Sequence, residues 1–238
     1  MPQTKRPPAR ERARLREAAL LSAARKLGLS EGYLAFRMAD LAEEAGVSIG
    51  SLYRQFEAKE DVITALAAEA WVGRLAGFEQ AFARTDLAPD ERLVAGMIGD
   101  VRFSLDHPEL FGAEELAATR AVREGTSDAR RLRLTQLHDQ IVARITQAAR
   151  AAIDAGAFRA IGDAQAQART IDLAIWTLMA GTSHIVGADP ASIDGERALP
   201  RGFLDVLVAT FIGLGWQHDE PRDCVERIAH QLVGESMT

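Results

Sequence analysis

Near the N-terminus, two short helical patterns are joined by a turn centred on one glycine. Residues 38–56 have the sequence MADLAEEAGVSIGSLYRQF. Gly46 can adopt the left-handed conformation that ends a first helix, and Ser48 can cap a second one. Leu41 and Leu52 supply an apolar side to each helix. This arrangement predicts two helices crossing around a tight turn, which is a helix-turn-helix.

The rest of the chain is also expected to be helical. Apolar residues recur at helical spacing along it, and no strand-length alternation of apolar and polar residues stands between turn signals. Gly28 is expected to end the first helix, and residues 30–33 to form a loop. Besides 38–45 and 49–56, the predicted helices cover residues 10–27, 59–83, 91–105, 108–120, 127–155, 163–186, 200–216 and 221–233. We therefore expect an all-α fold.

Composition narrows the chemistry that the chain can carry. The single cysteine, Cys224, allows no internal disulfide and no cysteine metal cluster. His107, His138 and His184 lack metal-ligand spacing, so we expect no metal or cofactor. No HExxH, GxSxG or glycine-rich phosphate loop is present. This absence disfavours a helical enzyme, which is the alternative to a DNA-binding protein. Polar residues interrupt the apolar stretch 171–188, and no signal peptide is evident, so a cytoplasmic, non-membrane protein is expected.

Charge is divided unevenly along the chain. Residues 1–60 hold 11 Lys and Arg against 8 Asp and Glu, a formal charge of +3, within a total of −6. The remaining residues therefore carry −9 and would be repelled by a polyanion. The basic N-terminal part is the candidate DNA-facing part.

The second short helix exposes side chains suited to reading DNA. Arginine can pair with guanine and glutamine with adenine in the major groove. A glycine near the helix start allows close approach of the backbone to DNA, although it costs about 1 kcal/mol against alanine. The residues on or near this face are Ile49, Gly50, Ser51, Tyr53, Arg54 and Gln55.

Residues 45–60, with the pattern AGVSxGSLYxxFxxKE, resemble the signature of TetR-family regulators, and the resemblance extends over about residues 10–66. It implies an N-terminal three-helix DNA-binding domain and a C-terminal helical domain that binds a ligand and dimerises. The implied division is 1–9 as a disordered basic arm, 10–58 as the helix-turn-helix domain and 59–238 as the second domain.

The resemblance also implies roles for single residues. Ser48, Gly50 and Ser51 would lie near bases or phosphates, Tyr53 would meet the DNA backbone, and Lys59 would face a phosphate. Arg54 and Gln55 would determine which operator sequence the protein recognises. Two departures concern the first helix of the motif: no Ser or Thr precedes it as a cap, and Ala39 stands where arginine is common. Arg37 is expected to contact the DNA backbone instead.

Two late helices are candidates for a homodimer interface. Residues 200–216 are apolar nearly all round, and residues 163–186 carry an apolar stripe. The resemblance implies that both helices pair with their copies in a four-helix bundle, whereas the residues alone allow burial within one subunit. The candidate interface residues are Ile171, Ile175, Leu178, Phe203, Leu207 and Phe211.

A pocket for an apolar or aromatic effector is expected among the C-terminal helices. The implied function is that of a transcriptional repressor, which the effector releases from its operator DNA. An activator, or a regulator that needs no ligand, is the alternative. The candidate lining residues are Trp71, Phe78, Phe82, Met97, Phe103, Phe111, His138, Trp176 and Met179.

Overall fold

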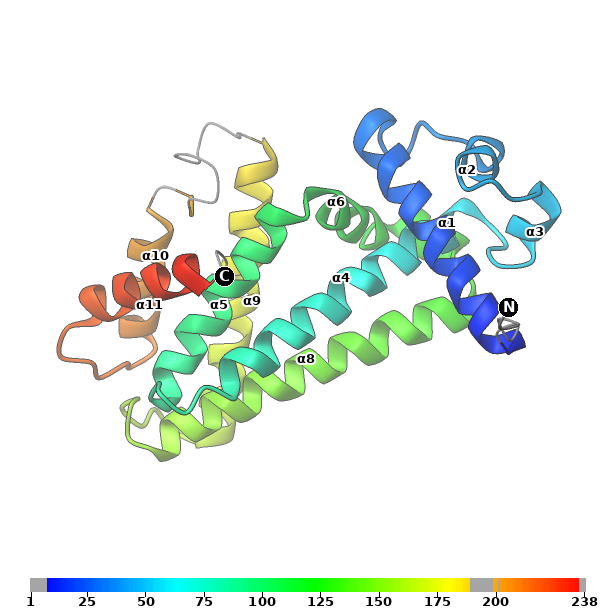
Figure 1. Cartoon of the computed structure of the whole chain (residues 1–238). Helices are drawn as coiled ribbons and strands as arrows, with labels where there is room; N and C mark the ends of the chain where they lie inside the picture. The colour runs from blue at the N-terminus through cyan, green and yellow to red at the C-terminus, as the bar shows by residue number, and fades with distance from the viewer. Residues whose placement is uncertain (1–7, 189–198, 201, 236–238) are drawn as a thin grey trace, which may run out of the picture. The chain divides into compact units, whose positions relative to one another are not determined.

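The fold is described from a computed structural model covering residues 8–188, 199–200 and 202–235. These residues form eleven helices (Figure 1). Phe158 and Trp216 form an isolated β-bridge, and the described residues contain no longer strand. The all-α prediction is therefore confirmed. Most of the predicted basic arm lies outside the described residues. No helix among those described is long and apolar enough to cross a bilayer.

The chain divides into two compact units, and each is described by itself. The N-terminal unit comprises residues 1–70 and 109–135. Its helices are α1 (Ala9–Glu31), α2 (Met38–Glu44), α3 (Ile49–Tyr53), the first half of α4 (Lys59–Phe82), α6 (Pro108–Ala117), α7 (Arg120–Gly125) and the start of α8 (Asp128–Asp154). In it, α2 packs on both α1 and α3 (Figure 1).

Spacing on α1 explains how the N-terminal unit is built. Leu20, Ala24 and Leu27 recur at intervals of three to four residues and are buried, so one face of α1 forms part of the core. From the segments that follow, Phe36 and Phe56 are fully buried. This core holds α2 and α3 in place.

Several predicted helix boundaries in the N-terminal unit were wrong, among them the end of α3, which lies at Tyr53 and not at Phe56. The first helix does not end at Gly28 and includes residues 30 and 31; it ends before Gly32, whose φ of 85° lies in the left-handed region. The helix predicted over residues 108–120 ends at Ala117, and residues 120–125, which were not predicted as a helix of their own, form a separate one, α7. Thr119 starts it by accepting a hydrogen bond from the Val122 N–H at 3.4 Å.

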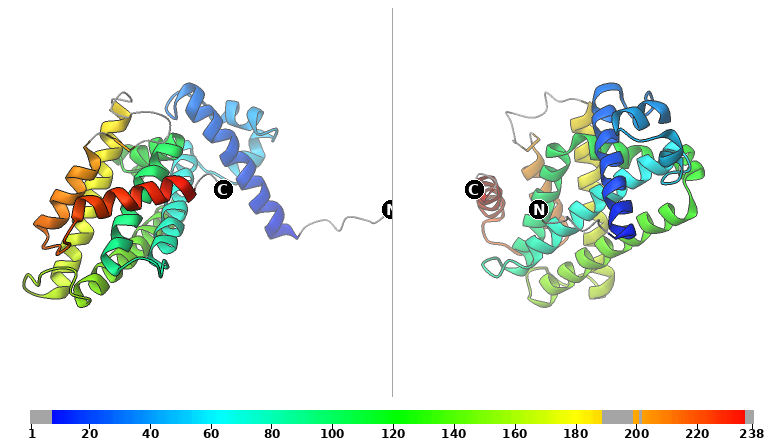
Figure 2. Two further views of the ribbon diagram at one scale, coloured as in Figure 1. Left: turned by 60° about the vertical axis from the view of Figure 1, so that its left-hand side comes forward. Right: turned by 45° about the vertical axis from the view of Figure 1, so that its right-hand side comes forward.

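The C-terminal unit comprises residues 71–108 and 136–238. It holds the rest of α4 and α8 together with α5 (Pro89–Asp106), α9 (Ala164–Ala188), α10 (Phe203–Gly213) and α11 (Pro221–Glu235). Most of α5 is buried, and it packs against α9 and α11 (Figure 2). Helix α10 in turn packs against α9 and α11. Because most of its residues are buried, α5 forms part of the core of this unit.

A buried ion pair joins α4 to α5 inside the C-terminal unit. The Arg74 guanidinium donates to the Asp100 carboxylate and, at 2.9 Å, to the Ser104 hydroxyl. Arg74 is 6% and Asp100 4% exposed. Burial raises the pKa of Asp100, and the charge of Arg74 opposes that rise.

Candidate nucleic-acid interface

The turn between α2 and α3 is set by Gly46. Its φ of 65° is left-handed, and its N–H donates to the Glu43 carbonyl at 3.0 Å. The next N–H, of Val47, donates to the Ala42 carbonyl at 2.9 Å. These bonds close the end of α2 and reverse the chain within three residues, as the sequence predicted.

Helix α3 begins at the predicted cap. The Ser48 hydroxyl accepts a hydrogen bond from the Ser51 N–H at 3.2 Å. With only five residues, α3 has little stability of its own and depends on tertiary packing. Leu52 supplies that packing, because its side chain is 0% exposed.

The side of α3 opposite Leu52 faces solvent. Ile49 is 45% and Tyr53 50% exposed. Gly50 and Arg54 are also exposed, and a Cβ at Gly50 would meet no atom within 4 Å. Helix α3, which packs on the core through Leu52, therefore presents an exposed face that is mixed apolar, aromatic and basic. Of the other candidates, Ser48 and Arg37 are exposed, while Ser51, Gln55 and Lys59 are partly buried.

At the start of α2, the hydrogen-bond acceptor is Asp40, a residue of the helix itself, and not the side chain of the residue before it. The Asp40 carboxylate accepts the Arg37 backbone N–H at 2.8 Å and the Arg37 guanidinium at 3.1 and 3.2 Å. These hydrogen bonds, and the nearby positive charge, hold the pKa of Asp40 below its usual value. Asp40 thus satisfies one backbone donor at the start of α2, although no Ser or Thr side chain caps the helix. The Arg37 side chain remains 81% exposed.

Lys59, at the start of α4, is engaged with the loop before α2. Its ammonium donates to the Leu34 and Phe36 carbonyls at 2.8 and 2.7 Å and lies 4.6 Å from the centre of the Phe36 ring. Burial lowers the pKa of Lys59. Since a lysine has three N–H donors, one is left beyond these two carbonyls. The phosphate contact of Lys59 stays a prediction.

Arg130 supports the helix-turn-helix, although the sequence analysis did not single it out. Its guanidinium lies 4.3 Å from the centre of the Phe56 ring and donates to the Gln55 carbonyl at 3.1 Å and to the Glu17 carboxylate at 3.0 Å. It therefore joins α8 to α1 and to the segment after α3. The contact spans 75 residues along the chain, so no local pattern could have indicated it.

In the C-terminal unit, three predicted ligand residues come together. The rings of Trp71, His138 and Trp176 lie 5.2 to 5.7 Å apart between centres. Beside them, Asp172 is 8% exposed, and its pKa is raised to about 6 by burial, an effect that His138 opposes. Asp172 Oδ1 and Trp176 Nε1 are buried without a hydrogen-bond partner. This group, Trp71, His138, Asp172 and Trp176, is called the aromatic cluster below.

The other predicted ligand-binding residues do not come together at one site. Phe78, Met97 and Met179 are at most 2% exposed and belong to the core. Phe82 lines a cavity of about 220 Å³ together with Arg92 and Arg144, among others. The last two are Phe103, which lies 4.7 Å from His107 between ring centres, and Phe111, which belongs to the N-terminal unit.

The predicted interface residues lie mostly inside a single chain. Five of the six candidates are at most 4% exposed and belong to its core, so their side chains are not exposed to a second copy in this conformation. Leu178 is partly buried against the same core. The exposed apolar side chains of α9 and α10 are others: Leu173 at 66%, Ile185 at 58%, and Val206 and Ile212 at 51% each. The buried five are Ile171, Ile175, Phe203, Leu207 and Phe211.

Residues 20–66 match the sequence model of the tetR family of bacterial regulatory proteins. No match was found among curated protein sequences. The structure is similar to the TetR family regulator PfmR from Thermus thermophilus, with 24% identity, a TM-score of 0.53, and 74% of this chain and 86% of that one covered. It is also similar to SmeT, solved with triclosan, with 20% identity, a TM-score of 0.61, and 87% of this chain and 94% of that one covered. A third similar structure is FadR from Bacillus subtilis, solved with stearoyl-CoA, with 15% identity, a TM-score of 0.59, and 89% of this chain and 97% of that one covered. The chain thus has the fold of these proteins, and the match to the tetR-family model is confined to the segment that holds the helix-turn-helix.

Proposed function

We propose that this chain, whose residues 20–66 carry the TetR-family helix-turn-helix, is a transcriptional repressor that a small-molecule effector releases from operator DNA. The observation that carries the proposal is the exposed face of α3 in front of the fully buried Leu52. Arg54 and Gln55 supply the base-reading donors, and Gly50 lets the backbone approach closely. Its site of action is the cytoplasm, where bacterial operator DNA lies.

Contacts with the DNA backbone come from groups around α3. Arg37 holds an exposed guanidinium beside the start of α2, and the third N–H donor of Lys59 remains for a phosphate. Tyr53 presents a half-exposed ring and hydroxyl. Because each neutralised phosphate releases counterions, operator affinity should fall steeply with salt.

Specific binding requires two copies, since a single helix-turn-helix buries too little DNA. The proposed interface uses the exposed apolar side chains of α9 and α10, of which Leu173 is the most exposed. Leu173→Lys should give a monomer in light scattering, because it would bury a charge in an apolar interface. Leu132, also exposed and apolar at 59% but outside these helices, offers the matched control Leu132→Lys, which should stay dimeric.

The effector site is assigned to the aromatic cluster. Its rings offer stacking surfaces, and Asp172 Oδ1 and Trp176 Nε1 offer one acceptor and one donor. Two structural relatives that were solved with small organic molecules support a ligand-responsive C-terminal unit. Effector binding would favour subunit arrangements that do not match the operator spacing, with a coupling of about 1–3 kcal/mol.

The test is binding to duplexes tiled across the DNA upstream of the protein's own gene, measured by fluorescence anisotropy at several salt concentrations. One or a few tiles should bind at least a thousandfold more tightly than the rest. A panel of aromatic compounds should then release the bound tile. Equal affinity for every tile would contradict sequence-specific DNA binding. Tight binding to one tile that no compound weakens would contradict release by a small-molecule effector.

A further inference from the structure

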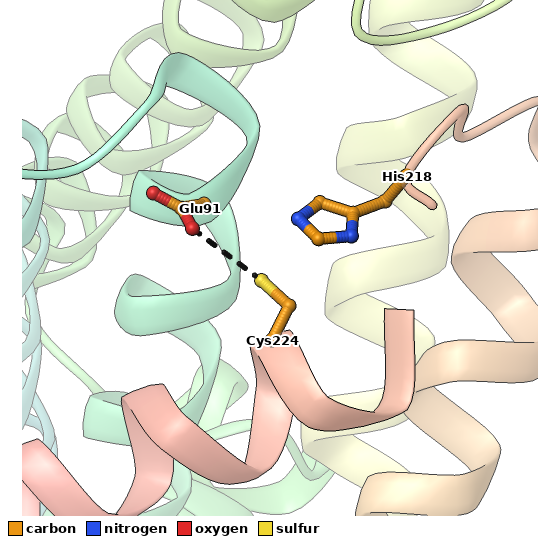
Figure 3. A group of neighbouring side chains, drawn as sticks. All are labelled: Glu91, His218 and Cys224. Atoms are coloured by element: carbon orange, nitrogen blue, oxygen red, sulfur yellow. Dashed lines mark hydrogen bonds between the residues drawn. The ribbon is translucent and has the colours of Figure 1, made fainter. Parts of the chain in front are cut away.

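Three possible metal ligands from separate elements converge in the C-terminal unit. Glu91 lies in the first turn of α5, His218 in the segment between α10 and α11, and Cys224 in the first turn of α11. One carboxylate oxygen, one imidazole nitrogen and the sulfur all lie within 4.8 Å of one another. In Figure 3 the thiol and a ring nitrogen of His218 both point toward the Glu91 carboxylate.

We propose that Glu91, His218 and Cys224 bind a divalent zinc-like ion, with a fourth position left for water. Thiolate, imidazole and carboxylate are the ligand types that zinc prefers, and a three-ligand set leaves an open position. Two ligands of a tetrahedral zinc ion stand about 3.5 Å apart, given metal–ligand distances of roughly 2.0–2.3 Å. Cys224 Sγ and Glu91 Oε1 are already at 3.6 Å, so only the longer separations within the set, of up to 4.8 Å, have to shorten.

The surrounding contacts hold two of the ligands in place. Glu91 Oε2 accepts the Ala88 N–H at 2.8 Å, which leaves Oε1 facing the sulfur. The Trp216 ring lies 5.1 Å from the His218 ring, and its indole N–H donates to Asp90 at 2.7 Å. Outer contacts of this kind orient ligands before a metal arrives.

The charges around the site suit a divalent cation. Burial and the neighbouring carboxylates raise the pKa of the Cys224 thiol, so it becomes a thiolate only when a metal binds. In that state Glu91, Asp90 and Cys224 carry three negative charges, and Arg227, which pairs with Glu91 Oε1, carries one positive charge. The net charge of −2 is balanced by one divalent ion. Cys224 is 3% exposed, whereas Glu91 and His218 are only partly buried, so an ion can enter from solvent.

Binding requires the Cys224 thiol to give up its proton, which now points to Glu91 Oε1, to solvent as the metal–sulfur bond forms. It also requires two local rearrangements. His218 Nδ1 accepts the exposed Glu220 N–H at 3.2 Å, so the other ring nitrogen carries the proton in the neutral ring. Coordination through that other nitrogen moves the proton to Nδ1, and water can take over the Glu220 N–H. The Arg227 guanidinium also has to share Glu91 Oε1 with the ion. The site would join α11 to α5 by coordination bonds.

The experiment is a Co²⁺ titration of the tag-free full chain after treatment with a chelator. One equivalent should produce a thiolate-to-cobalt absorption band with tetrahedral d–d bands, and Zn²⁺ should displace it. Cys224→Ser should lose the thiolate band. His218→Ala and Glu91→Gln should each weaken binding by more than about 100-fold, because loss of a direct ligand costs more than loss of an outer contact. His230→Ala is the matched control, because His230 lies on α11, is exposed and stands outside the cluster; it should bind Co²⁺ like the wild type.

Thermal unfolding gives a second readout, because an ion that binds only the folded chain raises the Tm. Zn²⁺ should raise the Tm of the wild type and of His230→Ala, but not that of His218→Ala. The proposal is overturned if the folded wild type gives no thiolate–cobalt band, or if His218→Ala binds Co²⁺ as tightly as the wild type. Neither readout involves DNA, so failure here leaves the proposed repressor function intact.

Discussion

The ring of Tyr33 occupies the space that a side chain at residue 28 would fill. A Cβ at Gly28 would lie 2.3 Å from two carbon atoms of that ring. The ring cannot easily move, since its hydroxyl donates to the Glu109 carbonyl at 2.7 Å and Tyr33 is 6% exposed. Gly28 is therefore needed for close packing inside α1 and not for ending the helix.

Gly28→Ala should lower the free energy of unfolding by about 1–3 kcal/mol, although alanine favours helix by about 1 kcal/mol. The loss comes from displacing the Tyr33 ring. Urea denaturation measures it, with Gly77→Ala as the control. Gly77 lies inside α4, and a Cβ there would meet no atom within 4 Å, so this change should stabilise the protein. Equal stabilisation by both changes would contradict the packing role of Gly28.

Gly50→Ala should separate folding from DNA binding. A Cβ at this position would meet no atom of the protein within 4 Å, and alanine should stabilise the helix by about 0.5–1 kcal/mol. Operator affinity should nevertheless fall at least tenfold, because the methyl group would stand between α3 and the DNA. Thermal unfolding and anisotropy on the same sample check both halves. Undiminished affinity would show that the start of α3 stays away from the duplex.

The helix-turn-helix could be predicted from sequence because its determinants are local. The turn depends on the φ of Gly46, and the start of α3 depends on Ser48 and a backbone N–H three residues away. Gly28 was misinterpreted for the opposite reason. Its role depends on Tyr33 and, through it, on Glu109, which is 76 residues further along the chain.

The same distinction applies to the C-terminal unit. Periodicity identified its helices and their apolar residues, but it could not say which apolar face stays inside the subunit. Phe211 and Ile212 are neighbours on one apolar helix, yet one is 0% and the other 51% exposed. The meeting of Glu91 with Cys224 was also not predictable, because it depends on how α11 packs against α5.

Arg74→Met should be strongly destabilising, by about 3–5 kcal/mol, because it leaves the Asp100 carboxylate buried without its counter-charge. The double variant Arg74→Met with Asp100→Leu should recover most of that loss, since apolar side chains suit the buried site. Denaturant unfolding of both singles and the double measures the coupling. Additive losses in the double variant would mean that the pair does not act as a unit.

Asp172 should make stability depend on pH. Its folded-state pKa of about 6 lies above the usual unfolded value, so its contribution to stability is present below about pH 4 and is lost as the pH rises through about 6. Asp172→Asn should therefore gain about 1 kcal/mol relative to the wild type between pH 4.5 and 7.5, after allowance for solvent screening. Denaturant unfolding at both pH values measures this.

The control for that comparison is Asp106→Asn, at an exposed aspartate near the end of α5. This variant should run parallel to the wild type between the two pH values. If Asp172→Asn also runs parallel, the burial of Asp172 does not perturb its ionisation.

The central claim is that α3 lies against operator DNA with Tyr53 on the contact face. Tyr53 is 50% exposed, so Tyr53→Ala should leave the Tm within a few degrees of the wild type. The adjacent change Leu52→Ala removes a fully buried side chain and should cost about 2–5 kcal/mol of stability. Together the two variants distinguish a surface role from a core role within one helix.

The most direct measurement is the affinity of the folded Tyr53→Ala protein for the selected operator duplex, by anisotropy at fixed salt. The account predicts that specific binding is lost while circular dichroism and Tm stay those of the wild type. Wild-type affinity in the folded variant would contradict it, because a duplex docked on α3 cannot avoid this side chain.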